Sequence, residues 1–146
     1  MIIDLKKIRL TGKEEQSFFF EYQPQTDLVD IPSMNLVLPV KVEGRAYLTG
    51  MHTAYIEGSV VFTLEGECSR CLTPTTKEIA IEFAENFDAD NIESYPVVCD
   101  KIDLGNVVND LIIMNLPMQL LCDDNCKGLC SVCGANLNEG ACKCEK

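Results

Sequence analysis

The clearest hydrophobic pattern in the chain lies in residues 78–87, which read EIAIEFAENF. Ile79, Ile81 and Phe83 occupy alternate positions there, separated by glutamate and alanine. A period of two places alternate side chains on the same face of an extended backbone. The stretch therefore predicts a β-strand with one face on a core and the other in solvent.

Longer stretches before this strand follow the same period less strictly. Residues 36–50 and 54–68 are rich in valine, aromatic and threonine side chains, which suit a pleated surface. Gly44 lies inside the first of them and predicts a turn or a bulge. Residues 2–10 and 17–22 predict two shorter strands. An antiparallel meander is the simplest way to connect these segments.

The period changes near residue 103, where the sequence reads IDLGNVVNDLIIMNLPM. Asp103 can cap the start of a helix, and Pro117 limits its end. The spacing predicts a helix over about 103–116 that packs on the sheet. Its apolar stripe consists of Leu104, Val107, Val108, Leu111 and Ile112.

These elements predict an α+β protein that is mainly antiparallel β-sheet, arranged as a meander or a partly open barrel, with one packed helix. With 146 residues the chain is long enough to bury a substantial core. We expect a β-rich domain over 1–120, followed by a cysteine-rich zinc-knuckle module over 121–146.

The distribution of cysteines adds most to this prediction of the fold, because six of the nine cysteines fall between residues 122 and 144. The first ten residues, MIIDLKKIRL, do not have the pattern of a secretory signal, and we find no apolar run long enough for a membrane span. These observations predict a cytoplasmic protein whose thiols are reduced or bound to metal.

The motif CSVCG, residues 130–134, is the strongest indication of metal binding. Two thiolates separated by two residues can hold one ion, and Gly134 can adopt the positive φ that such a turn requires. The tail is poor in large apolar residues, so a structural zinc ion would supply its missing stability. An iron–sulfur cluster fits the spacing less well, and a loose reduced tail is the remaining alternative.

One zinc ion needs four of the six tail sulfurs. The preferred ligand set is Cys126, Cys130, Cys133 and Cys144, with Cys142 and Cys122 as alternates. Four thiolates leave no open coordination position, so this spacing does not favour metal-dependent hydrolysis.

Cys68 and Cys71 form a second CxxC pair, at a bend between two predicted strands. They could be buried turn cysteines, a redox-active pair, or half of a split zinc site with Cys130 and Cys133. Redox pairs of the thioredoxin type precede a helix, whereas a strand is expected here.

The net charge is −11, with eleven acids and one base between residues 78 and 124. Such a surface disfavours broad contact with a phosphate backbone and suits a basic partner, although it could be simply a solvated face. Four basic residues are candidates for local contacts with RNA or a partner: Lys6, Lys7, Arg9 and Arg70.

Three segments together resemble the YceD family: CSRCL at 68–72, IDLGNVVNDLIIMNLP at 102–117, and CKGLCSVCGANLNEGACKC at 126–144. The resemblance implies a non-enzymatic cytoplasmic factor in large ribosomal subunit biogenesis or ribosomal RNA accumulation. It also implies a basic ribosomal protein or large-subunit precursor RNA as partner, with no membrane and no small-molecule substrate. The alternatives are a thiol–disulfide protein that uses Cys68 and Cys71, and a zinc-bearing interaction module unrelated to the ribosome.

Overall fold

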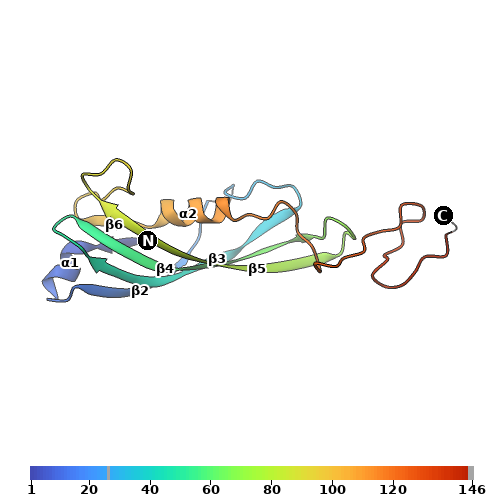
Figure 1. Cartoon of the computed structure of the whole chain (residues 1–146), viewed down its shortest axis with the longest axis horizontal. Helices are drawn as coiled ribbons and strands as arrows, with labels where there is room; N and C mark the ends of the chain where they lie inside the picture. The colour runs from blue at the N-terminus through green and yellow to red at the C-terminus, as the bar shows by residue number, and fades with distance from the viewer. Residues whose placement is uncertain (26, 145–146) are drawn as a thin grey trace.

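A computed structural model describes residues 1–25 and 27–144. The chain forms a long, twisted sheet with a helix on one face, and its cysteine-rich end extends beyond one end of the sheet (Figure 1). In chain order, the elements are β1 (Ile2–Asp4), α1 (Leu5–Leu10), β2 (Glu15–Tyr22), β3 (Met34–Leu48), β4 (Thr53–Glu67), β5 (Pro74–Asp88), β6 (Lys101–Asp103) and α2 (Gly105–Met114).

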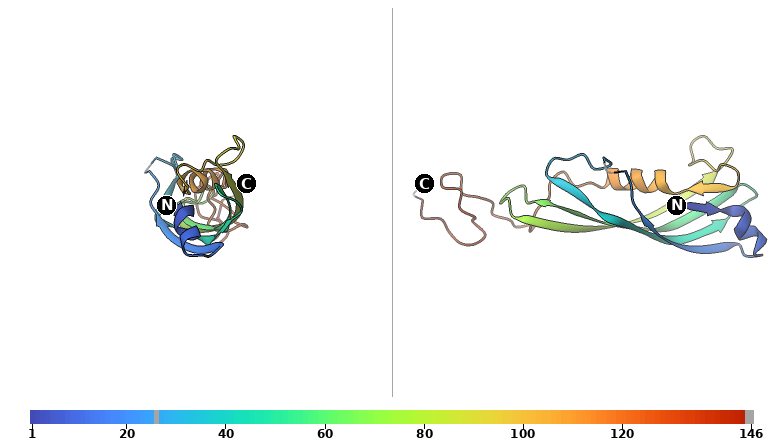
Figure 2. Two further views of the ribbon diagram at one scale, coloured as in Figure 1. Left: turned by 90° about the vertical axis from the view of Figure 1, so that its left-hand side faces the viewer. Right: turned by 180° about the vertical axis from the view of Figure 1, so that it is seen from behind.

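The main sheet is an antiparallel meander in the order β2-β3-β4-β5, and β1 pairs with β6 in a separate two-stranded sheet. Seen along the long axis, the strands curve around α2 (Figure 2). The sheet does not close into a barrel, because β2 and β5 remain its two edges. The expected α+β fold with an antiparallel meander is therefore confirmed.

The core lies between the concave face of the sheet and α2. Alternate residues of β4 are buried from Ala54 to Leu64, with Gly58 as the one exception, as a half-buried strand requires. The helix contributes Val107, Val108 and Ile112, which are all buried. The hydroxyl of Tyr22 on β2 donates to Asn109 Oδ1 at 3.0 Å and joins the sheet edge to the helix.

Gly44 does not form the predicted turn, because β3 runs through it without interruption. It pairs with Gly58 at the centre of the sheet, and a Cβ at Gly44 would lie 2.2 Å from the carbonyl oxygen of Glu57. Only glycine lets the two central strands approach so closely. The register shift in β3 lies earlier, between Val37 and Lys41, next to the cis Leu38–Pro39 peptide.

The strand predicted over residues 2–10 is wrong beyond Asp4, because residues 5–10 form α1. The side chain of Asp4 accepts a hydrogen bond from the Lys7 amide and caps this helix. Leu5 and Ile8 have helical spacing, and both are buried. The second helix, α2, begins at Gly105, so the prediction of Asp103 as its N-cap is wrong: Leu104 takes that position, and Asp103 Oδ1 accepts the Gly105 amide at 2.9 Å.

Within the described residues, no helix has the length and apolar character needed to span a membrane.

Candidate metal centres

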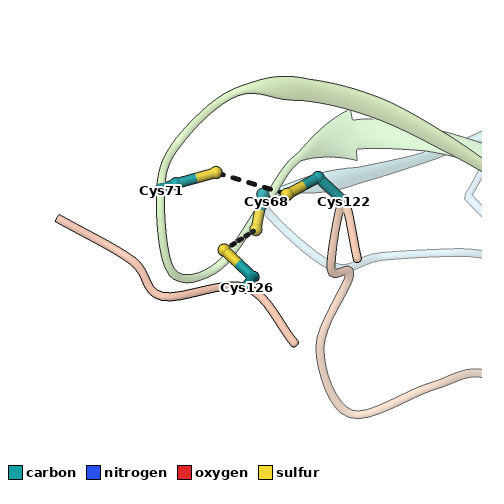
Figure 3. A group of neighbouring side chains, drawn as sticks. All are labelled: Cys68, Cys71, Cys122 and Cys126. Carbon is teal, nitrogen blue, oxygen red and sulfur yellow. Dashed lines mark hydrogen bonds between the residues drawn. The ribbon is translucent and has the colours of Figure 1, made fainter. Parts of the chain in front are cut away.

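Four sulfurs meet where the bend between β4 and β5 contacts the start of the tail (Figure 3). They belong to Cys68, Cys71, Cys122 and Cys126, and all four lie within 4.8 Å of one another. The Sγ atoms of Cys68 and Cys126 are 3.7 Å apart, and those of Cys71 and Cys122 are 3.5 Å apart. We call this set the hairpin group.

A second set of four sulfurs lies further along the tail and consists of Cys130, Cys133, Cys142 and Cys144. These sulfurs also lie within 4.8 Å of one another, and the Sγ atoms of Cys130 and Cys142 are 3.4 Å apart. We call this set the tail group. No disulfide links any of the nine cysteines, all of which belong to the described part of the chain.

The spacing of the sulfurs fits a tetrahedral metal site. Zinc binds thiolates at about 2.3 Å, which puts tetrahedral sulfurs about 3.8 Å apart. The measured separations of 3.4–3.7 Å are close to this value. A set of four soft thiolates selects zinc or iron among the common metals. Each group can therefore hold one metal ion in a closed site.

The two CxxC turns share a backbone conformation. In each, the amide of the residue after the second cysteine donates to the carbonyl of the first at 2.9 Å, from Leu72 to Cys68 and from Gly134 to Cys130. Both donor residues have positive φ, 60° for Leu72 and 72° for Gly134. The positive φ expected at Gly134 is thus confirmed, and the hairpin group uses the same turn with a leucine in it.

The hairpin group has an uneven charge distribution. Burial of the Cys68 thiol opposes its ionisation, but hydrogen bonds from neighbouring backbone amides outweigh burial and lower its pKa to about 6. The hydrogen bond with Cys71, together with burial, raises the pKa of Cys122 to about 12. The pKa is thus lowered for Cys68 and raised for Cys122, and a divalent cation bound among the sulfurs would favour the ionised form of both.

The tail group shows the same division. Backbone amides of Cys133 and Val132 lower the pKa of Cys130 to about 6. The hydrogen bond with Cys133 raises the pKa of Cys144 to about 11. The amide of Val132 lies 3.4 Å from the Cys130 sulfur, which shows how this turn directs backbone N–H groups at a thiolate.

Hydrogen bonds also attach the tail to the hairpin between β4 and β5. The Ser69 amide donates to the carbonyl of Leu120 at 2.8 Å, and Arg70 Nη1 donates to the carbonyl of Cys126 at 3.0 Å. Gly128 is buried at φ +75°, and a Cβ there would lie 3.3 Å from the Arg70 carbonyl. The backbone of the tail therefore crosses directly over the tip of the hairpin.

Asn138, which the sequence analysis did not single out, joins the two groups. Its Nδ2 lies 3.3 Å from the Cys126 sulfur, and its Oδ1 accepts the Lys127 amide at 2.8 Å. Cys126 belongs to the hairpin group, while Asn138 lies in the loop that closes the tail group.

The predicted ligand set is divided between the two groups. Cys130, Cys133 and Cys144 are brought together, but their fourth neighbour is Cys142, and Cys126 lies in the hairpin group. Cys122, the second alternate, joins the hairpin group as well. The split-site alternative required Cys68 and Cys71 to meet Cys130 and Cys133, but the two pairs lie in different groups. Which of these sulfurs bind metal stays a prediction.

The basic candidates lie far apart. Lys6, Lys7 and Arg9 are exposed on α1, at the opposite end of the molecule from the tail (Figure 1). Arg9 donates to the carbonyl of Met51, which fixes it beside the β3–β4 turn. Arg70 lies at the hairpin tip beside the hairpin group. These residues therefore do not form one basic surface.

Comparison with known proteins finds a family and several relatives. Residues 56–146 match the family described as "Large ribosomal RNA subunit accumulation protein YceD". A maize protein described as "Large ribosomal RNA subunit accumulation protein YCED homolog 1, chloroplastic" is 34% identical over 67 residues, which are 45% of this chain and 23% of the maize protein. The protein of the same description from Arabidopsis thaliana is 38% identical over 50 residues, 34% of this chain and 16% of the relative.

A bacterial relative covers more of the chain. The protein YlbN of Bacillus subtilis, described as uncharacterized, is 29% identical over 119 residues, 71% of this chain and 66% of that protein. The matched part of this chain spans less than a quarter of the length of the two plant relatives. No solved structure matches the chain.

Proposed function

The chain belongs to the YceD family, whose profile matches more than half of its length, and from this premise we propose that it is a non-enzymatic factor in the accumulation of large-subunit ribosomal RNA. The names of the plant relatives support this proposal. The observation that carries it is the position of the match, because residues 56–146 contain both groups of four sulfurs and the hairpin that joins them to the sheet. We propose that the end of the molecule that carries the two groups of sulfurs is the part that recognises its target.

Each group of sulfurs holds one structural zinc ion in this proposal. When bound, zinc supplies a rigid tetrahedral crosslink and no catalytic position, because four thiolates fill its coordination sphere. The sulfurs of Cys68 and Cys71 then tie the tail to the sheet, and those of the tail group order the last turns. The result is a rigid docking element on a stable sheet.

The partner in this proposal is a basic ribosomal protein, large-subunit precursor RNA, or both. The net charge of −11 supports a basic protein, since opposite charge speeds association and excludes wrong partners. Lys6, Lys7, Arg9 and Arg70 would supply the few direct RNA contacts. A cytoplasmic location is part of the same proposal, because thiols stay reduced in that compartment.

Depletion of the chain in its own cells tests this function. We expect the ratio of large-subunit to small-subunit ribosomal RNA to fall, and the wild-type chain to restore it. The double variant Cys71→Ser/Cys126→Ser should fail to restore the ratio, because it removes half of the hairpin group. Cys99→Ser is the matched control, since Cys99 is exposed and belongs to neither group. An unchanged ratio after depletion would exclude the function.

A thiol–disulfide function is the second candidate, favoured by the lowered pKa of Cys68. Its geometry is less favourable, because Cys68 and Cys71 are 0% and 6% exposed and each faces a sulfur of the tail. A reactive thiol has to be reached by its substrate. Oxidation of a dithiol substrate by the metal-free chain, with a small disulfide supplied as the electron acceptor and the activity lost in Cys68→Ser, would establish this candidate instead.

A further inference from the structure

The outer edge of β5 is long and regular. All fifteen residues from Pro74 to Asp88 pair with β4 without a register shift, whereas β3 is interrupted between Val37 and Lys41. Beyond that ladder, the described residues add only one bridge, between Phe87 and Tyr95 at the end of the strand. Most of β5 therefore has one paired edge and one open edge.

An open edge presents unpaired backbone groups. In an antiparallel strand, the N–H and C=O groups of alternate residues point away from the paired neighbour. Proteins protect such edges with an internal proline, a bulge or charged side chains, and after Pro74 β5 has only the charged side chains. Fifteen residues at about 3.3 Å each give an edge of about 50 Å, enough for a partner strand of any common length.

The charges of β5 indicate what could pair with this edge. The strand carries four acids, Glu78, Glu82, Glu85 and Asp88, against one base, Lys77. A second copy of the chain pairing through β5 would bring together two strands that each carry four acids and one base, and like charges on paired strands are destabilising. A strand with lysine or arginine at alternate positions would instead face opposite charge.

The side chains beside the edge provide further contact surface. On the outer face, Ala80 and Ala84 are exposed and small, so neighbouring side chains of an added strand can lie flat against them. On the core face, Ile79 and Ile81 are only half-buried. An added strand would cover these isoleucines and extend the core at its border.

We propose that an extended, basic segment of a partner protein adds to the edge of β5 as a fifth antiparallel or parallel strand. Main-chain hydrogen bonds hold the segment, and the acids of β5 select its basic side chains. This inference deepens the proposed function and rests on it, because it names a protein rather than RNA as the occupant of one defined surface. The cysteine groups take no part in it and remain free to contact a second target.

A synthetic ten-residue peptide of alternating lysine and valine is the probe. Amide hydrogen exchange, read by nuclear magnetic resonance on the intact metal-loaded chain, should first show fast exchange at alternate residues of β5. Adding the peptide should slow amide exchange at those residues, while the exchange rates in β2 stay unchanged. A peptide methylated on the backbone nitrogens of its central lysine and valine keeps every charge but interrupts both of its edges, and it should bind at least tenfold more weakly.

Charge reversal provides the matched variants. Glu78→Lys/Glu82→Lys on β5 should weaken binding of the unmethylated peptide about tenfold, whereas Glu15→Lys/Glu21→Lys, on the opposite edge strand β2, should change it less than twofold. Equal binding of the two peptides, or protection of β2 in place of β5, would overturn the inference. A chain that sediments as a dimer and loses that state in Glu78→Lys/Glu82→Lys would also overturn it, since the occupant would then be a second copy.

This inference can fail separately from the proposed function. If no peptide protects β5 while the chain still restores large-subunit ribosomal RNA in depleted cells, the strand-addition site is wrong and the function stands. If depletion leaves that RNA unchanged, the function is wrong whatever the peptide does.

Discussion

Between β3 and α2 the chain buries a continuous core of aliphatic and aromatic side chains, whereas residues 121–144 bury only Cys126, Gly128 and Cys130. The sheet can therefore be stable through removal of apolar surface from water. The tail has no comparable core, and its contacts are the two groups of sulfurs and a few backbone hydrogen bonds. In the function proposed above, one short chain therefore uses two separate sources of stability, joined where the β4–β5 bend meets the tail.

Metal removal should have the largest effect and should act on one region only. A chelator takes away the crosslinks of both groups, whose apparent binding free energy in isolated zinc modules is about 10–16 kcal/mol. We expect residues 121–144 to lose their protection from amide exchange and β2–β5 to keep theirs. Elemental analysis before treatment should find two metal ions per chain. Cooperative unfolding of the whole chain on chelation would contradict the division into two sources of stability.

A core substitution should produce the converse result. Phe62 is 1% exposed at the centre of β4, and Phe62→Ala leaves a cavity beneath α2. We expect the free energy of unfolding of the sheet to fall by about 3–5 kcal/mol. Denaturant unfolding followed by circular dichroism measures this change, and metal content at low denaturant should remain at its wild-type value. Loss of metal from the folded variant would show that the two regions are more tightly coupled than the contacts indicate.

Sequence alone predicted some of these elements and missed others. The alternation of Ile79, Ile81 and Phe83 predicted β5, and the period of the α2 stripe predicted the helix, because burial of one face follows directly from local periodicity. The short helix α1 was missed because its six residues contain too few turns to establish a period. Its capping residue, Asp4, gave the only local signal.

The partition of the cysteines could not be predicted, for a different reason. Sequence spacing relates sulfurs that are near in the chain, so it favoured a set containing Cys126 and Cys130. In the structure, the Ser69 amide at the hairpin tip donates to the carbonyl of Leu120, and this contact places Cys122 and Cys126 beside Cys68 and Cys71. A contact across about fifty residues depends on where α2 ends on the sheet, which is a property of the tertiary fold.

Asn138 allows the coupling between the two groups to be measured. Asn138→Ala removes the donor to the Cys126 sulfur and the acceptor of the Lys127 amide. Substitutions that remove a hydrogen bond to a metal ligand typically cost 10–100-fold in affinity, and we expect about tenfold faster metal release because Asn138 is exposed. A chromophoric chelator measures the release rate, and Asn125→Ala is the control, since within the described residues its side chain makes no hydrogen bond to a sulfur. Accelerated release from one group only would assign the effect to that group.

The smallest expected effect concerns the residue after each CxxC pair. Leu72 has a positive φ and is 57% exposed, so it carries backbone strain without the benefit of burial. Leu72→Gly should relieve that strain and stabilise the hairpin turn by about 1 kcal/mol, while Gly134→Ala should destabilise the tail turn by a similar amount. Metal affinity of each variant, measured by competition with a chelator, should rise for the first and fall for the second. Because a Cβ at Gly134 would meet no atom within 4 Å, its effect would come from the backbone alone. If Leu72→Gly lowers metal affinity instead, the leucine side chain holds the hairpin group in place, and the two turns are alike in conformation but not in what stabilises them.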